Sequence, residues 1–219
     1  MKRFACVAAV CLVAVLGVGA SAQAQTPSAG SDSKMSVEIN FGPTLGHKSA
    51  AFVGGEFDFR LTPGLDLVVE ASHMGNVGTT DLDSRAAIIA NFIGGTAATA
   101  FKANEFAFGA RYRVPVAAHV TPYILAAVGV ANVKTEVEFS VNGTTVDPAA
   151  RGVQLGGDLS GTQNKTIFVL GFGVNVPFKT RYFADLGYRY GQIFPKTDNF
   201  ETDTAIPTQR VILGVGVRF

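Results

Sequence analysis

The amino-acid sequence predicts an all-β fold, an eight-stranded antiparallel up-and-down transmembrane β-barrel. Eight segments alternate apolar and polar residues with a period of two, which is typical of strands with one apolar face. Each segment has about nine to eleven residues, the length that crosses a bilayer at a tilt near 45°. Short and long connections alternate between the segments, as expected when tight turns lie at one rim of a barrel and long loops at the other.

The composition excludes two other classes of protein. The chain has 219 residues, of which 47% are hydrophobic and only 16% are charged. An ordinary soluble domain has a charged fraction of about 25%, and a disordered chain has fewer hydrophobic residues. After the first 20 residues, no stretch approaches the ~18 consecutive apolar residues that a membrane-spanning helix needs. The sequence is therefore neither that of a helical membrane protein nor that of a disordered chain.

The N-terminus has the three parts of a secretory signal peptide. Lys2 and Arg3 give a basic start, residues 4–18 are an apolar run, and small residues follow up to Ala24. We predict a signal peptide at residues 1–24, cleaved after Ala22 or Ala24, rather than a buried helix, because the run has no amphipathic face. Residues 25–33 are predicted to be a flexible segment, and residues 34–219 the outer-membrane barrel domain.

Removal of this segment changes the chemistry available to the chain. Cys6 and Cys11 both lie within it, so the mature chain would have no disulfide, thiolate metal site or cysteine nucleophile. Loss of Lys2 and Arg3 leaves 16 basic and 17 acidic residues, and the formal charge changes from +1 to −1. A balanced charge gives no electrostatic signal for nucleic acid, so we expect no nucleic-acid partner.

The first three predicted strands have their apolar residues at odd-numbered positions. They occupy residues 35–41, 56–61 and 65–73. Residues 42–51 are predicted to form a loop, whereas Thr62-Pro63-Gly64 is predicted to form a tight turn. These strands and their connections begin the alternation of long and short links.

The next two predicted strands follow a long connection, residues 75–103, which is compatible with a short helix or with an extension of a strand. Residues 105–114 have apolar residues at even positions, and residues 115–119 form a short turn. The fifth strand begins at Val120, and its alternation continues beyond membrane length to Val141. Asn142-Gly143 favours a type I′ hairpin turn, so we predict a ribbon that stands above the barrel.

The last three predicted strands occupy residues 168–176, 182–190 and 210–219. A long loop at residues 147–165 precedes them, a tight turn at 177–180 joins the first two, and a polar loop at 191–207 joins the last two. Three short turns therefore separate four longer connections.

Alternation alone does not decide which face is outside, since a soluble lipocalin-like barrel has the same period. Two features favour an apolar exterior. The apolar faces are almost unbroken and have aromatic residues near strand ends, as lipid contact requires. The polar faces contain many glycines, which leave room in a narrow lumen for long charged side chains. The aromatic residues are Phe41, Tyr112, Tyr123, Tyr182 and Tyr190.

The lumen is predicted to hold nearly equal numbers of acids and bases. Isolated charges in so narrow a space would be costly, so the near balance predicts mutual ion pairs. We expect these pairs to plug the barrel, since eight strands leave space for side chains rather than a pore. A selectivity filter or gate is the alternative. The acids are Glu38, Glu56, Asp58, Asp66, Glu70, Glu105 and Asp185, and the bases are Arg60, Arg111, Arg113, Arg189, Arg210 and Arg218.

Four segments carry a resemblance to a known family. They are Thr121-Pro122-Tyr123-Ile124 through Gly129, Gly171-Phe172-Gly173-Val174, Leu186-Gly187-Tyr188-Arg189-Tyr190, and Val211 to Phe219. The chain after Ser33 resembles small Gram-negative outer-membrane barrels of the OmpA, OmpX and opacity-protein type. This resemblance is specific for architecture and weak for activity.

The resemblance implies a role for the C-terminus. In such barrels the assembly machinery reads the last strand and its C-terminal aromatic residue, which here is Phe219 after a series built from Val211, Leu213, Val215 and Val217. Full-length OmpA-type proteins continue into a peptidoglycan-binding domain, whereas this sequence ends at the eighth strand. We therefore expect no anchoring to the cell wall.

Some eight-stranded barrels are lipid A enzymes, and such an activity needs a nucleophile with a base within hydrogen-bond reach. Ser72 and His73 beside Glu70 form the one local cluster, but adjacent strand residues face opposite sides, which opposes a dyad. The loop carboxylates, such as Asp81 and Asp83, lack the spacing of metal ligands. Strand glycines such as Gly171 and Gly173 precede no helix and are not a phosphate loop. We expect no catalytic, metal or cofactor site.

The sequence thus predicts a monomeric outer-membrane barrel with a structural or surface-interaction role, exported by its signal peptide. Its expected partners are outer-membrane lipid and lipopolysaccharide, the barrel-assembly machinery, and an extracellular ligand bound through the long loops. A narrow channel for ions or small solutes is the alternative function, and a lipid A-modifying enzyme is the third.

Overall fold

Period-two alternation becomes a closed antiparallel barrel in the computed structural model, which describes residues 33–114, 120–155, 159–195 and 205–219. These residues belong to one compact unit that spans Asp32–Phe219. The predicted signal peptide, nearly all of the predicted flexible segment and the predicted turn at 115–119 lie outside the described residues.

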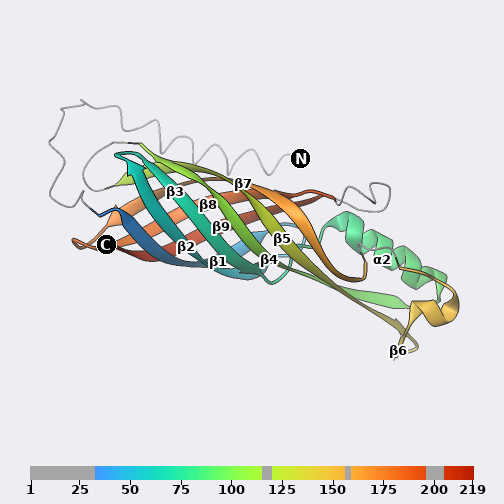
Figure 1. Ribbon diagram of the computed structural model, residues 1–219. Helices are drawn as coiled ribbons and strands as arrows, with labels where there is room; N and C mark the ends of the chain where they lie inside the picture. The colour runs from blue at the N-terminus through green and yellow to red at the C-terminus, as the bar shows by residue number, and fades with distance from the viewer. Residues whose placement is uncertain (1–32, 115–119, 156–158, 196–204) are drawn as a thin grey trace, which may run out of the picture. The chain divides into compact units, whose positions relative to one another are not determined.

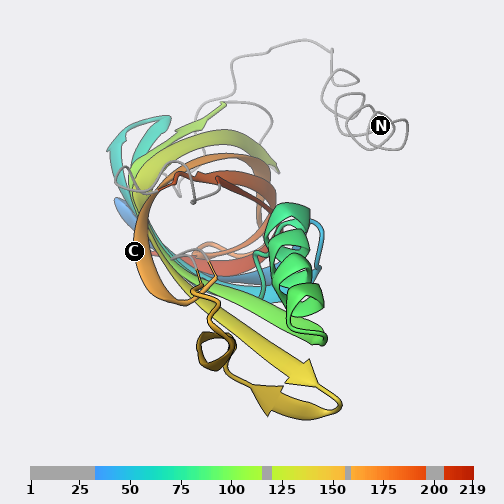
Figure 2. The ribbon, with the colours of Figure 1, turned by 90° about the vertical axis from the view of Figure 1, so that its right-hand side faces the viewer.

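Within the described residues, eight strands form the barrel wall (Figure 1 and Figure 2). Their order in the sheet is β4-β3-β2-β1-β9-β8-β7-β5, and pairing of β4 with β5 closes the ring. All neighbouring strands are antiparallel. The predicted fold class is confirmed. The strands are β1 (Met35–Leu45), β2 (Ala50–Thr62), β3 (Leu65–Met74), β4 (Thr96–Arg113), β5 (Thr121–Val141), β7 (Gly161–Pro177), β8 (Tyr182–Ile193) and β9 (Ile206–Arg218).

The apolar faces of the strands point outward, as predicted. In β1, Ile39 is 65% exposed whereas its neighbours Glu38 and Asn40 are each 1% exposed. A water-soluble barrel would show the reverse, because burial of apolar side chains is what stabilises a fold in water. The exposed apolar exterior is therefore a surface suited to hydrocarbon.

The two rims of the barrel differ, as the alternation of connections predicted. One rim, which we name the turn rim, includes the turn at Pro63-Gly64, the turn at residues 178–181 and Phe219, whose amide donates to the carbonyl of Met35 at 2.8 Å. The opposite rim, the loop rim, includes residues 46–49 and the segment between β3 and β4. Asn142 (φ 52°) and Gly143 (φ 80°) make the predicted hairpin turn there, joining β5 to the short β6 (Thr144–Val146).

Six barrel strands are longer than the predicted nine to eleven residues, and three of them are much longer: β4 has 18, β5 has 21 and β7 has 17. The pairing of β4 with β5 continues to Thr96 and Ser140, whereas β3 ends at Met74 opposite Ala103. The pair therefore leaves the barrel as a two-stranded ribbon, which we name the β4–β5 ribbon (Figure 1). The loops predicted at 42–51 and 147–165 are correspondingly shorter, because β2 begins at Ala50 and β7 at Gly161.

The connection 75–103, for which a helix and a strand extension were both compatible, contains both. Helix α2 (Thr80–Phe92) is capped by Thr79, whose side chain accepts a hydrogen bond from the amide of Leu82. The carboxylates of Asp81 and Asp83 in its first turn interact favourably with the positive end of the helix dipole. Leu82, Ala86 and Ala90 are its buried residues, and the helix packs on the β4–β5 ribbon.

A short 3-10 helix, η1 (Pro148–Arg151), follows β6, and the side chain of Asp147 caps it by accepting from the amide of Ala149. Neither described helix is long and apolar enough to cross a membrane.

Candidate functional site

The lumen contains two layers of different chemistry. Toward the turn rim, buried arginines and carboxylates form what we name the charged layer. Toward the loop rim, apolar side chains form what we name the apolar layer. The charged layer contains the thirteen residues proposed from the sequence, which the structure places on the inner face of β1, β2, β3, β4, β8 and β9.

Arg111 lies at the centre of the charged layer and is 1% exposed. Its Nη1 donates to Oδ2 of Asp58 at 3.0 Å, and its Nη2 forms an ion pair with Glu56. Both acids come from β2, which is two strands away from β4 in the sheet. The guanidinium also lies 4.3 Å from the ring centroid of Tyr123, a cation–π contact. Arg111 therefore ties strands together across the lumen.

Arg189 and Arg210 extend the same network toward the loop rim. Arg189 Nη2 lies 3.4 Å from Oε2 of Glu56, and its Nε lies 3.8 Å from Oε2 of Glu70. Arg210 Nη1 donates to Oε1 of Glu70 at 3.0 Å, and its Nη2 lies 3.1 Å from Oε2 of Glu105. Because Glu56 and Glu70 each face two arginines, the three guanidiniums form one continuous chain of charges.

Near the turn rim, Arg60 and Arg113 share Asp66. Arg113 Nε lies 2.5 Å from Oδ2 of Asp66, and Arg60 Nε lies 3.7 Å from Oδ1. Arg113 Nη2 also lies 3.8 Å from Oδ2 of Asp58. Arg218 differs, since its Nη2 donates to the amide oxygen of Asn175 at 3.0 Å.

Glu38 and Asp185 are held differently from the other acids. Asp185 accepts hydrogen bonds from the hydroxyl of Tyr123 at 2.7 Å and from the amide of Asn175 at 3.0 Å. Both carboxylate oxygens of Glu38 are buried without a hydrogen-bond partner among the described residues. The balance of charges predicted ion pairs, and most of the thirteen residues form them. Arg218 and Asp185 instead have neutral hydrogen-bond partners, and Glu38 has none among the described residues.

Tyr123 does not belong to the outward aromatic set in which the sequence analysis placed it. It is 2% exposed and lies in the charged layer, whereas its neighbour Ile124 is 58% exposed. Its position near a strand end suggested an interfacial role, but its parity along β5 was the better signal, because it shares a face with Leu125. A phenol suits the lumen here, since its hydroxyl can donate to Asp185 and its ring can face Arg111.

Glycine is required beside Arg189. A Cβ on Gly171 would lie 2.5 Å from Cδ of Arg189, and one on Gly173 would lie 2.5 Å from the hydroxyl oxygen of Tyr123. These glycines make space for the long side chains, which agrees with the interpretation of the glycine-rich polar faces.

The sequence analysis did not predict the apolar layer. Alternation placed several of its members on the inner face, but they were counted with the polar positions. A cavity among the side chains near the loop rim has a volume of only about 10 Å³, roughly the space of one water molecule. The larger members of the layer are Phe52, Met74, Val77, Leu82, Phe101, Val133, Leu159, Ile167, Val169, Ile193 and Ile206.

A polar cluster at the loop rim fastens helix α2 to the barrel. Lys48 donates from Nζ to Asp83 at 2.9 Å and to the hydroxyl of Thr99 at 2.6 Å, and His47 Nε2 lies 2.9 Å from Oδ2 of Asp83. Thr99 also donates to Asp83. Partial burial raises the pKa of Asp83, but the bonds from Thr99 and Lys48 outweigh it, so the net pKa lies below the ordinary value. The sequence alone does not indicate this cluster, because the partners of Asp83 are distant from it in sequence.

The residues considered for catalysis lie on opposite faces of β3. Ser72 is buried and accepts from Nη1 of Arg210 at 2.8 Å, whereas His73 is on the outer face with Nδ1 2.7 Å from Oδ1 of Asn104. Their separation is the geometry that the alternation predicted. Across the described ranges, no three His, Cys, Asp or Glu side chains are arranged to hold a metal ion.

Comparison with known proteins gives the family. Residues 10–219 match the outer membrane protein beta-barrel domain family, so the chain belongs to that family. Membership in it supports a location in the outer membrane. A comparison with curated proteins gives no match.

A solved structure gives the same fold, and two others are reported beside it. Neisserial surface protein A is 16% identical, with 84% of this chain and 96% of that chain covered and a TM-score of 0.50. The N-terminal barrel domain of OprF from Pseudomonas aeruginosa is 17% identical, with 84% and 97% covered and a TM-score of 0.49. Ail of Yersinia pestis is 14% identical, with 85% and 99% covered and a TM-score of 0.49. At these identities the likeness concerns the fold alone.

Proposed function

We propose that this outer-membrane barrel is a closed, non-enzymatic protein with a structural or surface-interaction role. The observation that carries the proposal is the filled lumen, in which the charged layer and the apolar layer follow one another. An ion would have to separate buried Arg–carboxylate pairs in the first and then cross hydrocarbon side chains in the second. Both steps are costly, because a charge loses its hydration in each.

The part of the protein suited to interaction lies beyond the loop rim. Helix α2, the β4–β5 ribbon, β6 and the segment after η1 share a small core of their own around Ala90, Ile93 and Phe139. On α2, Ile88 is 67% exposed and Phe92 is 79% exposed. Apolar side chains in such positions favour contact with another molecule. In barrels of this kind the long loops are extracellular, so we assign this rim to the cell exterior.

The same proposal includes the route to the membrane and the remaining partners. Residues 1–24 would direct export, and Phe219 at the end of the last strand would serve as the signal for the assembly machinery. Phe219 is 58% exposed at the turn rim, where a partner could reach it. Lipid and lipopolysaccharide would surround the apolar exterior of a monomer.

Planar bilayer recordings test the closed lumen. We expect no stable conductance from the purified, folded protein. A reproducible ohmic step would contradict the proposal and favour the narrow channel. A variant with Arg111→Ala and Arg189→Ala, which widens the charged layer, is the matched test of the apolar layer, since we expect that layer alone to keep conductance absent.

Activity on lipid A that is lost in His73→Ala would contradict the non-enzymatic role.

A further inference from the structure

The outer face of the barrel changes from apolar to polar within one step along each of the adjacent strands β3, β4 and β5. Phe106 on β4 and Val130 on β5 are register partners, 58% and 51% exposed. Two residues nearer the loop rim, the partners are Asn104 and Asn132, which continue to His73 on β3 and Asn164 on β7. This change marks the border where hydrocarbon contact ends and lipid headgroups begin.

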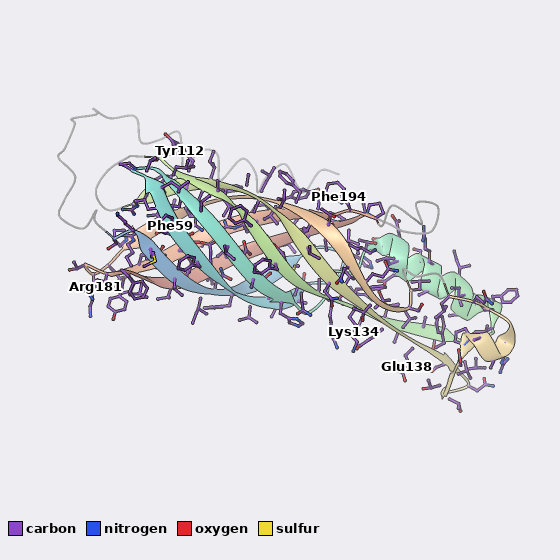
Figure 3. All side chains as sticks on the ribbon, viewed as in Figure 1. Phe59, Tyr112, Lys134, Glu138, Arg181 and Phe194 are labelled. Atoms are coloured by element: carbon purple, nitrogen blue, oxygen red, sulfur yellow. The ribbon has the colours of Figure 1, made fainter. Side chains whose placement is uncertain are left out.

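Directly above this border, two lysines lie side by side. Lys102 on β4 and Lys134 on β5 are register partners with side chains 43% and 57% exposed. Figure 3 shows Lys134 where the β4–β5 ribbon leaves the barrel. Like charges in directly opposite positions of a sheet are destabilising, so the two lysines require a negatively charged group nearby.

One carboxylate joins the two ammonium groups. Glu136 lies 3.0 Å from Nζ of Lys102 and 2.7 Å from Nζ of Lys134. Hydrogen bonds from Lys134 and Lys102 hold the pKa of Glu136 below its ordinary value, so it is ionised at neutral pH. The three groups together keep one net positive charge. The next acid along β5, Glu138, accepts from the hydroxyl of Thr145 at 3.0 Å.

We propose that Lys102 and Lys134 bind a phosphate group of an outer-leaflet lipid, with amide donors of Asn104 and Asn132 beside it. The acyl chains of that lipid would continue over Phe106 and Val130, so the site joins a charged headgroup contact to the apolar surface below it. Charge complementarity and this continuity favour a lipid phosphate over free phosphate, which has no acyl chains to bury. The inference rests on the membrane location and is independent of whether the lumen conducts.

The experiment compares two lipids that differ only in their phosphates. Protein refolded in phosphatidylcholine vesicles is titrated with phosphorylated lipid A and with dephosphorylated lipid A, and binding is followed by energy transfer from a Trp placed at Phe106 to a labelled lipid. We expect wild type to prefer the phosphorylated form. A juxtamembrane lysine changes affinity for anionic lipid by about fivefold, so Lys102→Gln and Lys134→Gln should each weaken that preference by about this factor.

Two further variants make the test specific. Glu136→Gln removes the competing carboxylate and should strengthen binding of phosphorylated lipid A, an effect that a merely structural role would not give. Lys179→Gln, at the turn rim, should leave the preference unchanged. Heat-modifiability on a gel checks that each variant is folded. Equal binding of the two lipids by wild type, an unchanged preference in the double lysine variant, or displacement of lipid A by millimolar inorganic phosphate would each overturn the proposal.

Discussion

The two layers of the lumen fill the same barrel by different physics. In the charged layer, each central arginine reaches acids on other strands, so its contacts fix the positions of strands relative to one another. In the apolar layer, side chains such as Phe101 and Ile167 are fully buried and contribute by packing. A charged contact is directional and fails if one partner is lost, whereas packing is lost gradually as volume is removed. The layers should therefore respond differently to substitution.

Removal of a central guanidinium should have the largest effect. Arg111→Met breaks the buried ion pairs that Arg111 makes with Glu56 and Asp58, and breaking a buried pair costs about 3–5 kcal/mol. The free energy of unfolding, from urea titration in lipid vesicles, measures it. Lys179→Met, an exposed change of similar chemistry, is the control. A loss below about 1 kcal/mol for Arg111→Met would mean that the charged layer does not hold the strands together.

Truncation of a side chain in the apolar layer should lower the free energy of unfolding by a smaller amount. Ile167→Ala removes three carbons from a fully buried side chain, and we expect a loss of about 3 kcal/mol in the same titration. Unlike Arg111→Met, it leaves no charge unpaired, so its effect should be insensitive to salt. If the free energy of unfolding is unchanged, the side chains of the apolar layer are packed less tightly than the structure indicates.

A small-to-large substitution beside Arg189 should lower the free energy of unfolding by less than the two changes above. It tests how tightly the charged layer is packed. The Cβ of Gly171→Ala would press on Cδ of Arg189, and overpacking of this kind costs about 1–3 kcal/mol. Gly55→Ala, where a Cβ would meet only a backbone oxygen at 3.5 Å, is the matched control and should be nearly neutral. Equal effects of the two changes would show that the arginine moves aside without cost.

The smallest effect on stability is expected for the polar cluster around Asp83 at the loop rim. Because the pKa of Asp83 is lowered in the folded state, its contribution to stability is present above the ordinary aspartate pKa of about 3.9 and is lost as pH falls through the lower folded value. The protection factors of α2 amides, which correct hydrogen exchange for its intrinsic pH dependence, should therefore fall below about pH 4 in wild type and change less in Asp83→Asn. Asp81→Asn, in the same helical turn, should behave as wild type. An identical pH profile in Asp83→Asn would contradict this role.

The sequence predicted the barrel and the charged layer because both depend on parity along a strand. Ion pairing between β2 and β4 follows once Glu56 and Arg111 face the same narrow lumen. The apolar layer was missed because odd or even position along a strand separates inner from outer side chains. It does not give the position of a side chain along the barrel axis. Val169 was thus counted among the polar positions. The cluster around Asp83 was missed for another reason, since His47, Lys48 and Thr99 meet it only when the ends of β1, β2 and β4 come together.

The central claim is that apolar side chains face lipid and ionic ones face the lumen. The chain contains no Trp, so one introduced Trp reports its own surroundings. Phe172 is 49% exposed on the outer face, and Tyr123 lies inside at the same depth, opposite Gly173. In vesicles of brominated lipid, we predict strong quenching of Phe172→Trp fluorescence and little quenching of Tyr123→Trp. Strong quenching of Tyr123→Trp with protection of Phe172→Trp, both variants being folded, would contradict the account.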